Sequence, residues 1–376
     1  MSASIPSADA PLESVTTTLL KTLQADGYYA LFLKFPTLAN NIRNARLNPS
    51  FRKVHIGTEK TVSSFDSELK LGWTLAKLTA AIPKKGLEAI MRGTVAYDSI
   101  TDPNIGWYPR KGPGIYVVGL AVSGRAGKWL SRNEIEQLRR LIKQYCRGYM
   151  ALVNGASVSN SDVLFVRSVD GQFPGSVKGR KSRFIDNADE LARVNALHEA
   201  LGRRCSTQSD PTGDVFQIQS PLYVGCSDKL QNRTQDYLKP NVNNINKPLG
   251  LTMSLTSETG KPAQVFVQVE NQLPVAERLV TTLANSYVCQ DGFNATEAGG
   301  KLGGAKVADF AEAEIKVYAR NKHLEENIDA VLNDTVDRID CLTKLEDLIA
   351  VQNDVDRHVE EIRTLHSATS KQRPEL

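Results

Sequence analysis

Short apolar runs rich in β-branched residues, set between long helical stretches, constrain the fold of this chain most. In WYPRKGPGIYVVGLAV at 107–122, Gly and Pro precede an apolar run that is typical of a β-strand. DVLFVRSVDGQF at 162–173, VFQIQSPLYVG at 215–225 and AQVFVQVE at 263–270 predict further strands. The segments between them have helical spacing of apolar residues, so the sequence predicts a small sheet combined with helices.

Two helices are expected between the first and third of these runs. LSRNEIEQLRRLIKQYCRGYMALV begins with Ser131 as the predicted N-cap, and Glu134 three residues later completes a capping box. ADELARVNALHEALGRR at 188–204 has the pattern of a second amphipathic helix. A short helix, SDKLQNRTQDYL, is expected after Gly225, then a polar loop before the last strand, and another helix near Pro274, where proline suits the first turn.

The first 106 residues are predicted to be mostly helical. PLESVTTTLLKTLQADG has apolar residues at helical spacing and is expected to stop at Gly27. SSFDSELKLGWTLAKLTAAIP ends at Pro83, and KKGLEAIMRG follows it. The region contains no acidic pair, histidine cluster or glycine loop that suggests chemistry, so we interpret it as a helical platform or a partner-binding element.

Residues 305–366 contain almost no glycine or proline and predict one long amphipathic helix. Its apolar positions recur at steps of three and four: Ile328, Leu332, Val336, Ile339, Leu342, Leu345, Ile349, Val355, Val359 and Ile362. Thr335, Arg338 and Gln352 interrupt any fixed heptad frame, so packing back onto the domain competes with a coiled-coil dimer. Of the two, we favour a homodimer formed through this helix.

Composition and charge narrow the functional classes. The 376 residues are 41% hydrophobic and 23% charged, as in ordinary globular proteins. Residues 301–376 carry eleven Lys and Arg against sixteen Asp and Glu, which leaves a net charge of +9 on the first 300 residues, a part that would attract a polyanion. The five cysteines form no C-x-x-C pair, and no signal peptide or membrane span is expected. We therefore expect an intracellular protein, in the nucleus or the cytoplasm, with no membrane partner.

One set of residues has the composition that phosphodiester chemistry needs. Arg233 and Tyr237 are four residues apart and share a helix face. Ser227 or Asp228 can cap this helix, and its free N-terminal amides favour a phosphate group. Glu277, at the start of a later helix, is a lone carboxylate of the kind that suits Mg²⁺, which keeps most of its water.

These residues resemble the GIY-YIG nuclease family. Gly114, Ile115 and Tyr116 read GIY as they stand, and Tyr223, Val224 and Gly225 read YIG with valine in the middle. Arg233 lies ten residues after Tyr223, at the spacing of the family's catalytic arginine, and Tyr237 is one turn further. Glu277 matches the metal-ligand glutamate, and Asn294 matches the asparagine of the family's G-x-N motif.

The resemblance implies both a fold and an activity. The fold is α+β, with a small antiparallel sheet flanked by helices over residues 107–304 and an inserted segment at about 123–213. The activity is metal-dependent endonuclease cleavage of DNA or RNA. Tyr116 would be the general base, Tyr223 would hydrogen-bond nearby, Arg233 would hold the scissile phosphate, and Glu277 would bind Mg²⁺ or Mn²⁺. Six site residues are thus implied: Tyr116, Tyr223, Arg233, Tyr237, Glu277 and Asn294.

The distance along the chain between the two tyrosines leaves alternatives open. Tyr116 and Tyr223 are 107 residues apart, although an insertion at a hairpin tip is tolerable because loop-closure entropy grows only logarithmically with length. The nearer run, VFQIQ, offers Phe216 as the partner, and a sheet built from it lacks one phenol. Such a fold would be inactive. A second interpretation keeps the GIY-YIG-like fold without catalysis, as a nucleic-acid-binding or protein-interaction module that assembles through its C-terminal helix. A third interpretation is an unrelated scaffold with coincidental matches.

Overall fold

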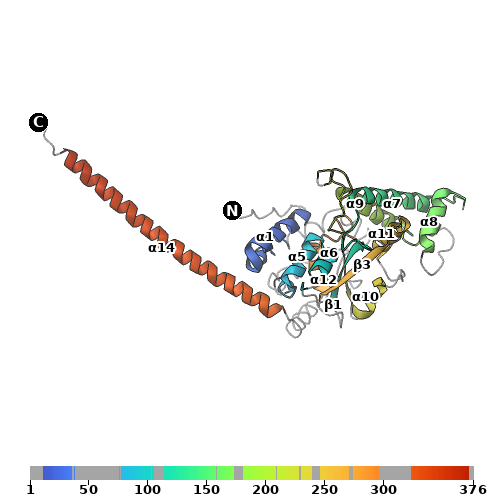
Figure 1. Ribbon diagram of the computed structural model, residues 1–376, viewed down its shortest axis with the longest axis horizontal. Helices are drawn as coiled ribbons and strands as arrows, with labels where there is room; N and C mark the ends of the chain where they lie inside the picture. The colour runs from blue at the N-terminus through green and yellow to red at the C-terminus, as the bar shows by residue number, and fades with distance from the viewer. Residues whose placement is uncertain are drawn as a thin grey trace. The chain divides into compact units, whose positions relative to one another are not determined.

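The structure is a computed structural model, drawn in Figure 1, and its chain divides into two units, Met1–Asn327 and Ile328–Leu376. It describes residues 12–35, 38, 76, 78–102, 104–105, 114–157, 159–172, 181–208, 210–227, 230–238, 246–270, 274–295 and 323–371. The first unit combines helices with a small antiparallel sheet, so the predicted α+β class is confirmed.

The sheet has three strands in the order β2-β1-β3. The central strand, β1 (Gly114–Val122), pairs antiparallel with β2 (Tyr223–Ser227) on one side and with β3 (Ala263–Glu270) on the other. All nine residues of β1 are buried, as expected for a central strand covered on both faces. The antiparallel sheet expected from the sequence is therefore present, and its neighbouring strands β1 and β2 come from distant parts of the chain.

The predicted strand at 215–225 is wrong in its first part, because only Tyr223, Val224 and Gly225 of that run join the sheet. The preceding residues run beside the connection between β1 and the next helix. There the amide of Trp129 donates to the carbonyl of Gln217, and the amide of Gln217 donates to the carbonyl of Leu130. These two hydrogen bonds pair the amide and the carbonyl of Gln217, but they do not add a strand to the sheet.

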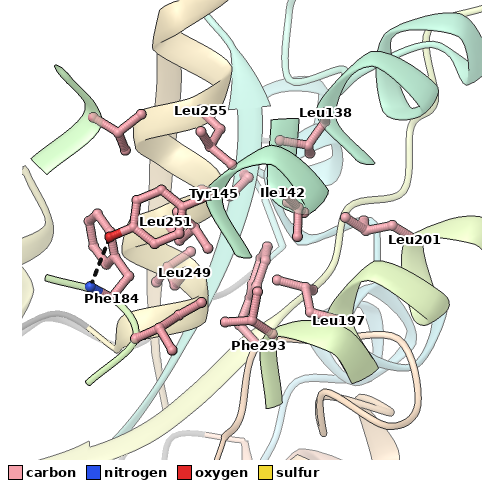
Figure 2. Close-up of a cluster of buried hydrophobic side chains, with 14 of the residues drawn as sticks. Leu138, Ile142, Tyr145, Phe184, Leu197, Leu201, Leu249, Leu251, Leu255 and Phe293 are labelled. Carbon is pink, nitrogen blue, oxygen red and sulfur yellow. Dashed lines mark hydrogen bonds between the residues drawn. The ribbon is translucent and has the colours of Figure 1, made fainter. Parts of the chain in front are cut away.

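One face of β1 contributes to the main hydrophobic core, part of which is shown in Figure 2. Side chains alternate along a strand, so Tyr116, Val118, Leu120 and Val122 point to this face. They belong to one cluster with Leu138 and other residues of the helices that cover the sheet. Each fully buried aliphatic side chain in such a core stabilises the fold by about 1.5–3 kcal/mol.

The helices of the inserted segment are α7 (Arg132–Val153), α8 (Ser161–Gly171) and α9 (Ala188–Arg203). The predicted capping box of α7 is confirmed, with Ser131 and Glu134 bonding each other's backbone amides. Glu134 also accepts from both guanidinium nitrogens of Arg125, at 2.7 and 2.9 Å. Burial would raise the pKa of Glu134, but these bonds outweigh it and hold the pKa below its usual range.

The predicted strand and turn at 162–173 is wrong, because residues up to Gly171 form α8. Asn160 caps the helix and accepts from the amides of Asp162 and Val163. Val163, Val166 and Val169 are spaced by three residues and are all buried, and α8 packs against α7. The valines therefore fill one helix face, and tertiary packing outweighs their preference for strands.

The polar loop predicted before β3 is also partly wrong, because α11 (Lys247–Glu258) lies there. Asn246 caps it by accepting from the amide of Leu249, and a proline occupies its first turn. The hydroxyls of Thr252 and Thr256 donate to carbonyls four residues earlier. Such residues have low intrinsic helix propensity, but Leu249, Leu251 and Leu255 point into the core (Figure 2) and hold the helix in place.

A buried polar group fixes the segment between α8 and α9. The Tyr145 hydroxyl donates to Asp170 Oδ1 at 2.6 Å, and the Arg183 amide donates to Asp170 Oδ2 at 3.0 Å. The Phe184 amide donates to the Tyr145 hydroxyl, a contact that Figure 2 marks. Burial raises the pKa of Asp170. These bonds satisfy the buried carboxylate and attach the segment at 181–186 to α7.

Of the N-terminal helices, α6 (Val95–Thr101) lies against the sheet, and α1 (Leu12–Leu33) and α5 (Lys84–Arg92) pack against each other and against α12 (Pro274–Leu283). The helix α1 does not stop at Gly27 as predicted, because Gly27 adopts φ 76° and ψ −167° and produces a kink within it. The helix α5 ends at Gly93, whose left-handed conformation caps it. The following α6 packs on β1.

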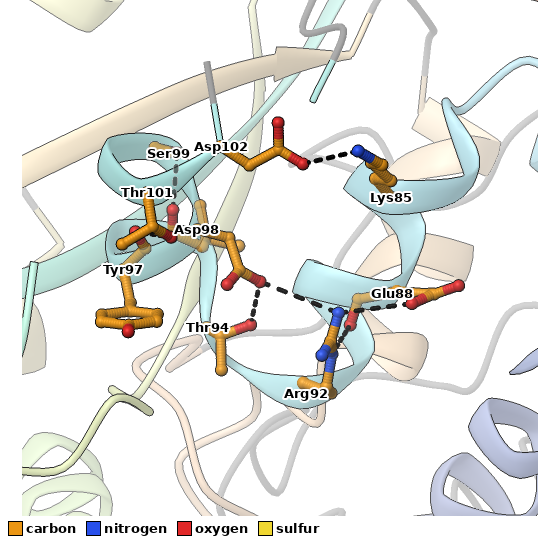
Figure 3. A network of polar contacts seen from close by, with 10 residues as sticks. Lys85, Glu88, Arg92, Thr94, Tyr97, Asp98, Ser99, Thr101 and Asp102 are labelled. Carbon is orange, nitrogen blue, oxygen red and sulfur yellow. Dashed lines mark hydrogen bonds and ion pairs between the residues drawn. The ribbon is translucent and has the colours of Figure 1, made fainter. Parts of the chain in front are cut away.

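Ion pairs join α5 to α6 and the residues that flank it, as Figure 3 shows. Arg92 lies between Glu88 and Asp98, at 3.3 and 4.0 Å, and the Thr94 hydroxyl contacts Asp98. Lys85 pairs with Asp102 at 2.8 Å. The cations Lys85 and Arg92 are 64% and 40% exposed, so solvent screens each pair, which contributes little stability by itself and mainly fixes the orientation of the two helices.

The long C-terminal helix expected from the sequence is confirmed as α14 (Leu324–Lys371). The first part of the predicted span, 305–322, lies outside the described residues. From Ile328 onward its large apolar side chains are exposed; Val336, Leu345 and Ile362 are 63%, 51% and 65% exposed. No helix in the described part of the chain is long and apolar enough to cross a bilayer.

Candidate active site

The pairing of β1 with β2 places Tyr116 directly opposite Gly225 and Val118 opposite Tyr223. The Tyr116 ring lies against Gly225, where an added Cβ would come within 2.5 Å of the Tyr116 hydroxyl oxygen and 2.6 Å of Cζ. Those distances are too short for any side chain, so glycine is the residue that admits the phenol at this point. The two halves of the predicted motif are therefore neighbours in the sheet.

The alternative partner, Phe216, does not occupy this position. Phe216 is 40% exposed and packs under the guanidinium of Arg125, whose Cζ lies 3.8 Å from the ring centroid. Its run does not pair with β2, because β1 and its tyrosine already fill that place. The alternative in which the run of Phe216 pairs with β2 in place of the Tyr116 strand is wrong.

Three tyrosines form one aromatic cluster. Tyr116 on β1, Tyr223 on β2 and Tyr237 on α10 (Leu230–Leu238) have ring centroids 5.6–6.1 Å apart in tilted arrangements. The hydroxyl oxygens of Tyr116 and Tyr237 are 3.2 Å apart. Tyr116 and Tyr237 are buried, whereas Tyr223 is half-buried. Tyr223 is thus the phenol of the cluster nearest to solvent.

Arg233 connects this cluster to the surface. Its Nε donates to the Tyr116 hydroxyl at 3.0 Å, and its Cζ lies 5.3 Å from the Tyr237 ring centroid. Its NH1 group is 3.5 Å from a carboxylate oxygen of Asp236. Arg233 and Tyr237 share one face of α10, as their spacing predicted. The predicted caps of this helix are not both described, since position 228 lies outside the described residues.

Tyr223, Tyr237 and Arg233 each keep one protonation state at neutral pH. Burial raises the pKa of Tyr223 and of Tyr237 above the usual range of a phenol. Burial would lower the pKa of Arg233, but the phenol oxygens of Tyr237 and Tyr116 outweigh it and raise the pKa. Tyr223 and Tyr237 are therefore neutral hydrogen-bond donors, and Arg233 is a permanent cation beside them.

Glu277 on α12 (Pro274–Leu283) lies beside the same end of β2. Its Oε2 accepts from the Cys226 thiol at 3.0 Å, and the residue is only 8% exposed. Burial is the main reason for the raised pKa of Tyr223, and the negative charge of Glu277 adds to it. Cys226 was not expected from the sequence, and the strand alternation that turns it toward α12 was the available signal.

Asn294 has a different geometry from the one its predicted catalytic role suggests. Its Oδ1 accepts from the Val224 amide at 2.9 Å, and its Nδ2 donates to the Val224 carbonyl at 2.7 Å. The side chain thereby imitates a neighbouring strand and satisfies the outer edge of β2. Because both ends of its amide bind backbone, Asn294 is a positioning residue for Tyr223 and Gly225.

Glu277 is the carboxylate that the sequence analysis assigns to a metal ion. Among the residues that the structure describes, no group of three or more His, Cys, Asp or Glu side chains could hold a metal ion. A single carboxylate is nevertheless compatible with Mg²⁺, which retains several waters and often takes one or two protein oxygens. The Cys226 thiol donates a hydrogen bond to Glu277. A thiol that keeps its proton does not compete as a metal ligand.

Tyr116 is thus in contact with Tyr223, Tyr237 and Arg233, Glu277 lies at the same strand β2 through Cys226, and Asn294 supports that strand from its outer side. Comparison of the chain with protein-family models, with curated proteins and with solved structures found no match.

Proposed function

We propose that the chain is a metal-dependent endonuclease that hydrolyses phosphodiester bonds of DNA or RNA through a site of the GIY-YIG type. The observation that carries the proposal is the pairing of Tyr116 with Gly225. This pairing gathers three phenols and a guanidinium from separate elements, next to a buried carboxylate. A cation for the phosphate and hydrogen-bonding groups for water are the parts that such a reaction needs.

Each residue of the site has a role that follows from its position. Arg233, whose side chain is 26% exposed, would bind the scissile phosphate with its outer nitrogens while Nε holds Tyr116. As the resemblance implies, Tyr116 would act as general base toward the attacking water, with its oxygen held by this bond. Tyr223, neutral and half-buried, would orient that water from the solvent side. Glu277 would hold Mg²⁺ or Mn²⁺, which when bound supplies positive charge to stabilise the leaving oxygen.

We expect the purified chain to cleave at least one member of a panel of linear and branched DNA and RNA when Mg²⁺ or Mn²⁺ is present. Chelation with EDTA should abolish the cleavage, and added metal should restore it. Glu277→Gln should lower the rate about a hundredfold or more, because it removes a charged ligand without changing the shape of the side chain. Cleavage rate on labelled substrates is the measurement.

Glu199→Gln is the matched control, because Glu199 is an exposed residue of α9. This variant should cleave at the rate of the unaltered chain, and both variants should give the same circular dichroism spectrum. Cleavage that continues in EDTA, or that survives both Glu277→Gln and Arg233→Ala, would contradict the proposal.

A second candidate function is favoured by the exposed apolar residues of α14. In this alternative the chain is a catalytically inactive nucleic-acid-binding or protein-interaction module that assembles through its C-terminal helix. A helix that exposes Leu332, Leu342 and Leu348 by 56%, 59% and 65% gains free energy by burying them against a partner. We propose a second copy of α14 as that partner, an arrangement that is also compatible with nuclease activity.

We expect the chain to be a dimer in solution, and the double variant Leu345→Asp/Ile362→Asp to be a monomer because it places charges on the surface to be buried. Light scattering coupled to size-exclusion chromatography measures the mass. The control variant Asn353→Asp/Thr364→Asp adds the same charge at polar positions of the helix and should remain dimeric. A monomeric unaltered chain at tens of micromolar would exclude this assembly.

A further inference from the structure

The positive charge of the chain is concentrated in the segment inserted between β1 and β2. Residues 123–213 contain fifteen Lys and Arg against nine Asp and Glu, a net charge of +6, whereas the whole chain carries +4. The remaining residues are therefore slightly acidic in sum. An electrostatic attraction for a polyanion should be centred on the inserted helices.

Within this segment, the outer face of α7 carries a row of exposed cations. Arg140, Lys143 and Arg147 are spaced by three and four residues, so they project from one side of the helix, and all three are exposed. Arg147 forms an ion pair with Asp162 at 3.1 Å, and its side chain is 63% exposed. Neither Arg140 nor Lys143 forms an ion pair with any residue that the structure describes.

The acidic residues of α7 do not neutralise this row. Glu134 is engaged with Arg125 at 2.7 Å, and Glu136 with Arg139 at 3.0 Å. On the facing helix α9, burial lowers the pKa of His198, and the charges of Arg139 and Lys143 lower it further, against the opposing effect of Glu199. The ring therefore stays neutral, and a net positive field persists over this side of α7.

The opposite face of α7 makes the row rigid. Leu138, Ile142 and Tyr145 are fully buried in the main core, where Figure 2 shows them beside Leu197 and Leu201 of α9. Arg140 and Arg147 are seven residues apart, a rise of about 10 Å along the helix. That length corresponds to about three base-pair steps along the axis of a duplex, at about 3.4 Å per step.

We propose that the outer face of α7 binds the phosphate backbone of nucleic acid outside the cleavage site. The inference rests on the proposed function, in that nucleic acid is the ligand of the chain. An acidic protein is the less favoured partner, because the centres of protein interfaces are depleted of charge and rich in apolar groups. Here Gln137 and Gln144 flank the row of cations, and neither is apolar.

The experiment measures binding by an inactive form, so that cleavage does not interfere. The parent is the full chain with Glu277→Gln, and the test variant adds Arg140→Gln and Lys143→Gln. Fluorescence anisotropy with a labelled 20-mer duplex gives the dissociation constant over a series of salt concentrations. We expect weaker binding and a slope of log K against log salt that is smaller by about 1.8, about 0.9 for each lost phosphate contact.

The loss should be equal for two duplexes of unrelated sequence, because phosphate contacts carry no sequence information. The matched control is Lys21→Gln with Lys84→Gln, two exposed lysines of α1 and α5, which removes the same charge from other surfaces. This control should keep the salt slope of the parent. An unchanged slope in the α7 variant would refute the inference, as would tighter binding of the parent to polyglutamate than to the duplex.

The outcome separates this inference from the nuclease proposal. A chain that loses salt-dependent binding through the α7 substitutions but cleaves nothing would refute the nuclease and leave the binding surface established. A chain that cleaves nucleic acid while the α7 substitutions leave its salt slope unaltered would refute the binding surface and support the nuclease proposal.

Discussion

Arg233→Ala is expected to lower the single-turnover cleavage rate about a thousandfold or more. Arginines that hold a reacting phosphate contribute on the order of 10³ to 10⁵ in rate in phosphoryl transfer. Here the same guanidinium also donates from Nε to the Tyr116 hydroxyl at 3.0 Å, so its removal takes away both the phosphate contact and the cation that stabilises the Tyr116 oxygen. Single-turnover kinetics with saturating enzyme isolates the chemical step from binding.

Arg233→Lys is the informative companion variant. Lysine keeps the positive charge but is a single point donor, so it cannot contact Tyr116 and a phosphate in the forked geometry of a guanidinium. We expect the cleavage rate of Arg233→Lys to lie between the rates of Arg233→Ala and of the unaltered chain. Both variants should unfold at nearly the temperature of the unaltered chain, because Arg233 is partly exposed. An alanine variant that cleaves at an unaltered rate would remove Arg233 from the mechanism.

Gly225→Ala is expected to destabilise the fold by about 1–3 kcal/mol and to impair cleavage, because it overpacks a filled site. The added Cβ would meet the Tyr116 ring and hydroxyl at 2.6 and 2.5 Å, and the ring is fully buried and cannot turn away into solvent. Tyr116 or the β2 backbone must move, and either shift separates the phenol from Arg233 or Tyr237. Urea denaturation measures the stability, and the nuclease assay measures the effect on the site.

Gly171→Ala is the control for this substitution. Gly171 ends α8, and a Cβ added there would meet nothing within 4 Å. Alanine has the higher helix propensity, so this variant should be neutral or slightly more stable. A Gly225→Ala chain with unaltered stability and activity would mean that the close packing of Tyr116 on β2 does not matter to the site.

The parts of the fold that local pattern determines were predictable from the sequence. The capping box of Ser131 and Glu134 and the apolar run of β1 each combine a start signal with a clear periodicity. Where local preference and tertiary packing disagree, the prediction failed. Val163, Val166 and Val169 favour a strand by residue type but fill a helix face against α7. Thr252 and its neighbours favour a loop, but the core retains them as α11.

The candidate site was predictable as a set of residues but not as an arrangement. The spacing of Arg233 and Tyr237 fixes their common face within one helix. The choice between Tyr116 and Phe216 depends instead on which strand pairs with β2, and that pairing is decided by packing over the whole sheet. The only signal for Cys226 is the strand alternation that turns it toward α12, and that alternation does not identify Glu277 as its partner there. The role of Asn294 depends on the edge of β2 that it satisfies, which the sequence does not display.

The position of β1 at the centre of the sheet has a consequence for how the protein is made. Both of its partner strands are encoded later, and about one hundred residues separate its end at Val122 from the start of β2 at Tyr223. At about 5–20 residues per second, a ribosome needs roughly 5–20 s to synthesise that stretch. During this interval the nascent chain carries an apolar strand with two unpaired edges. The cell must therefore shield it, by early collapse of the inserted helices around it or by a chaperone, until β2 and β3 emerge.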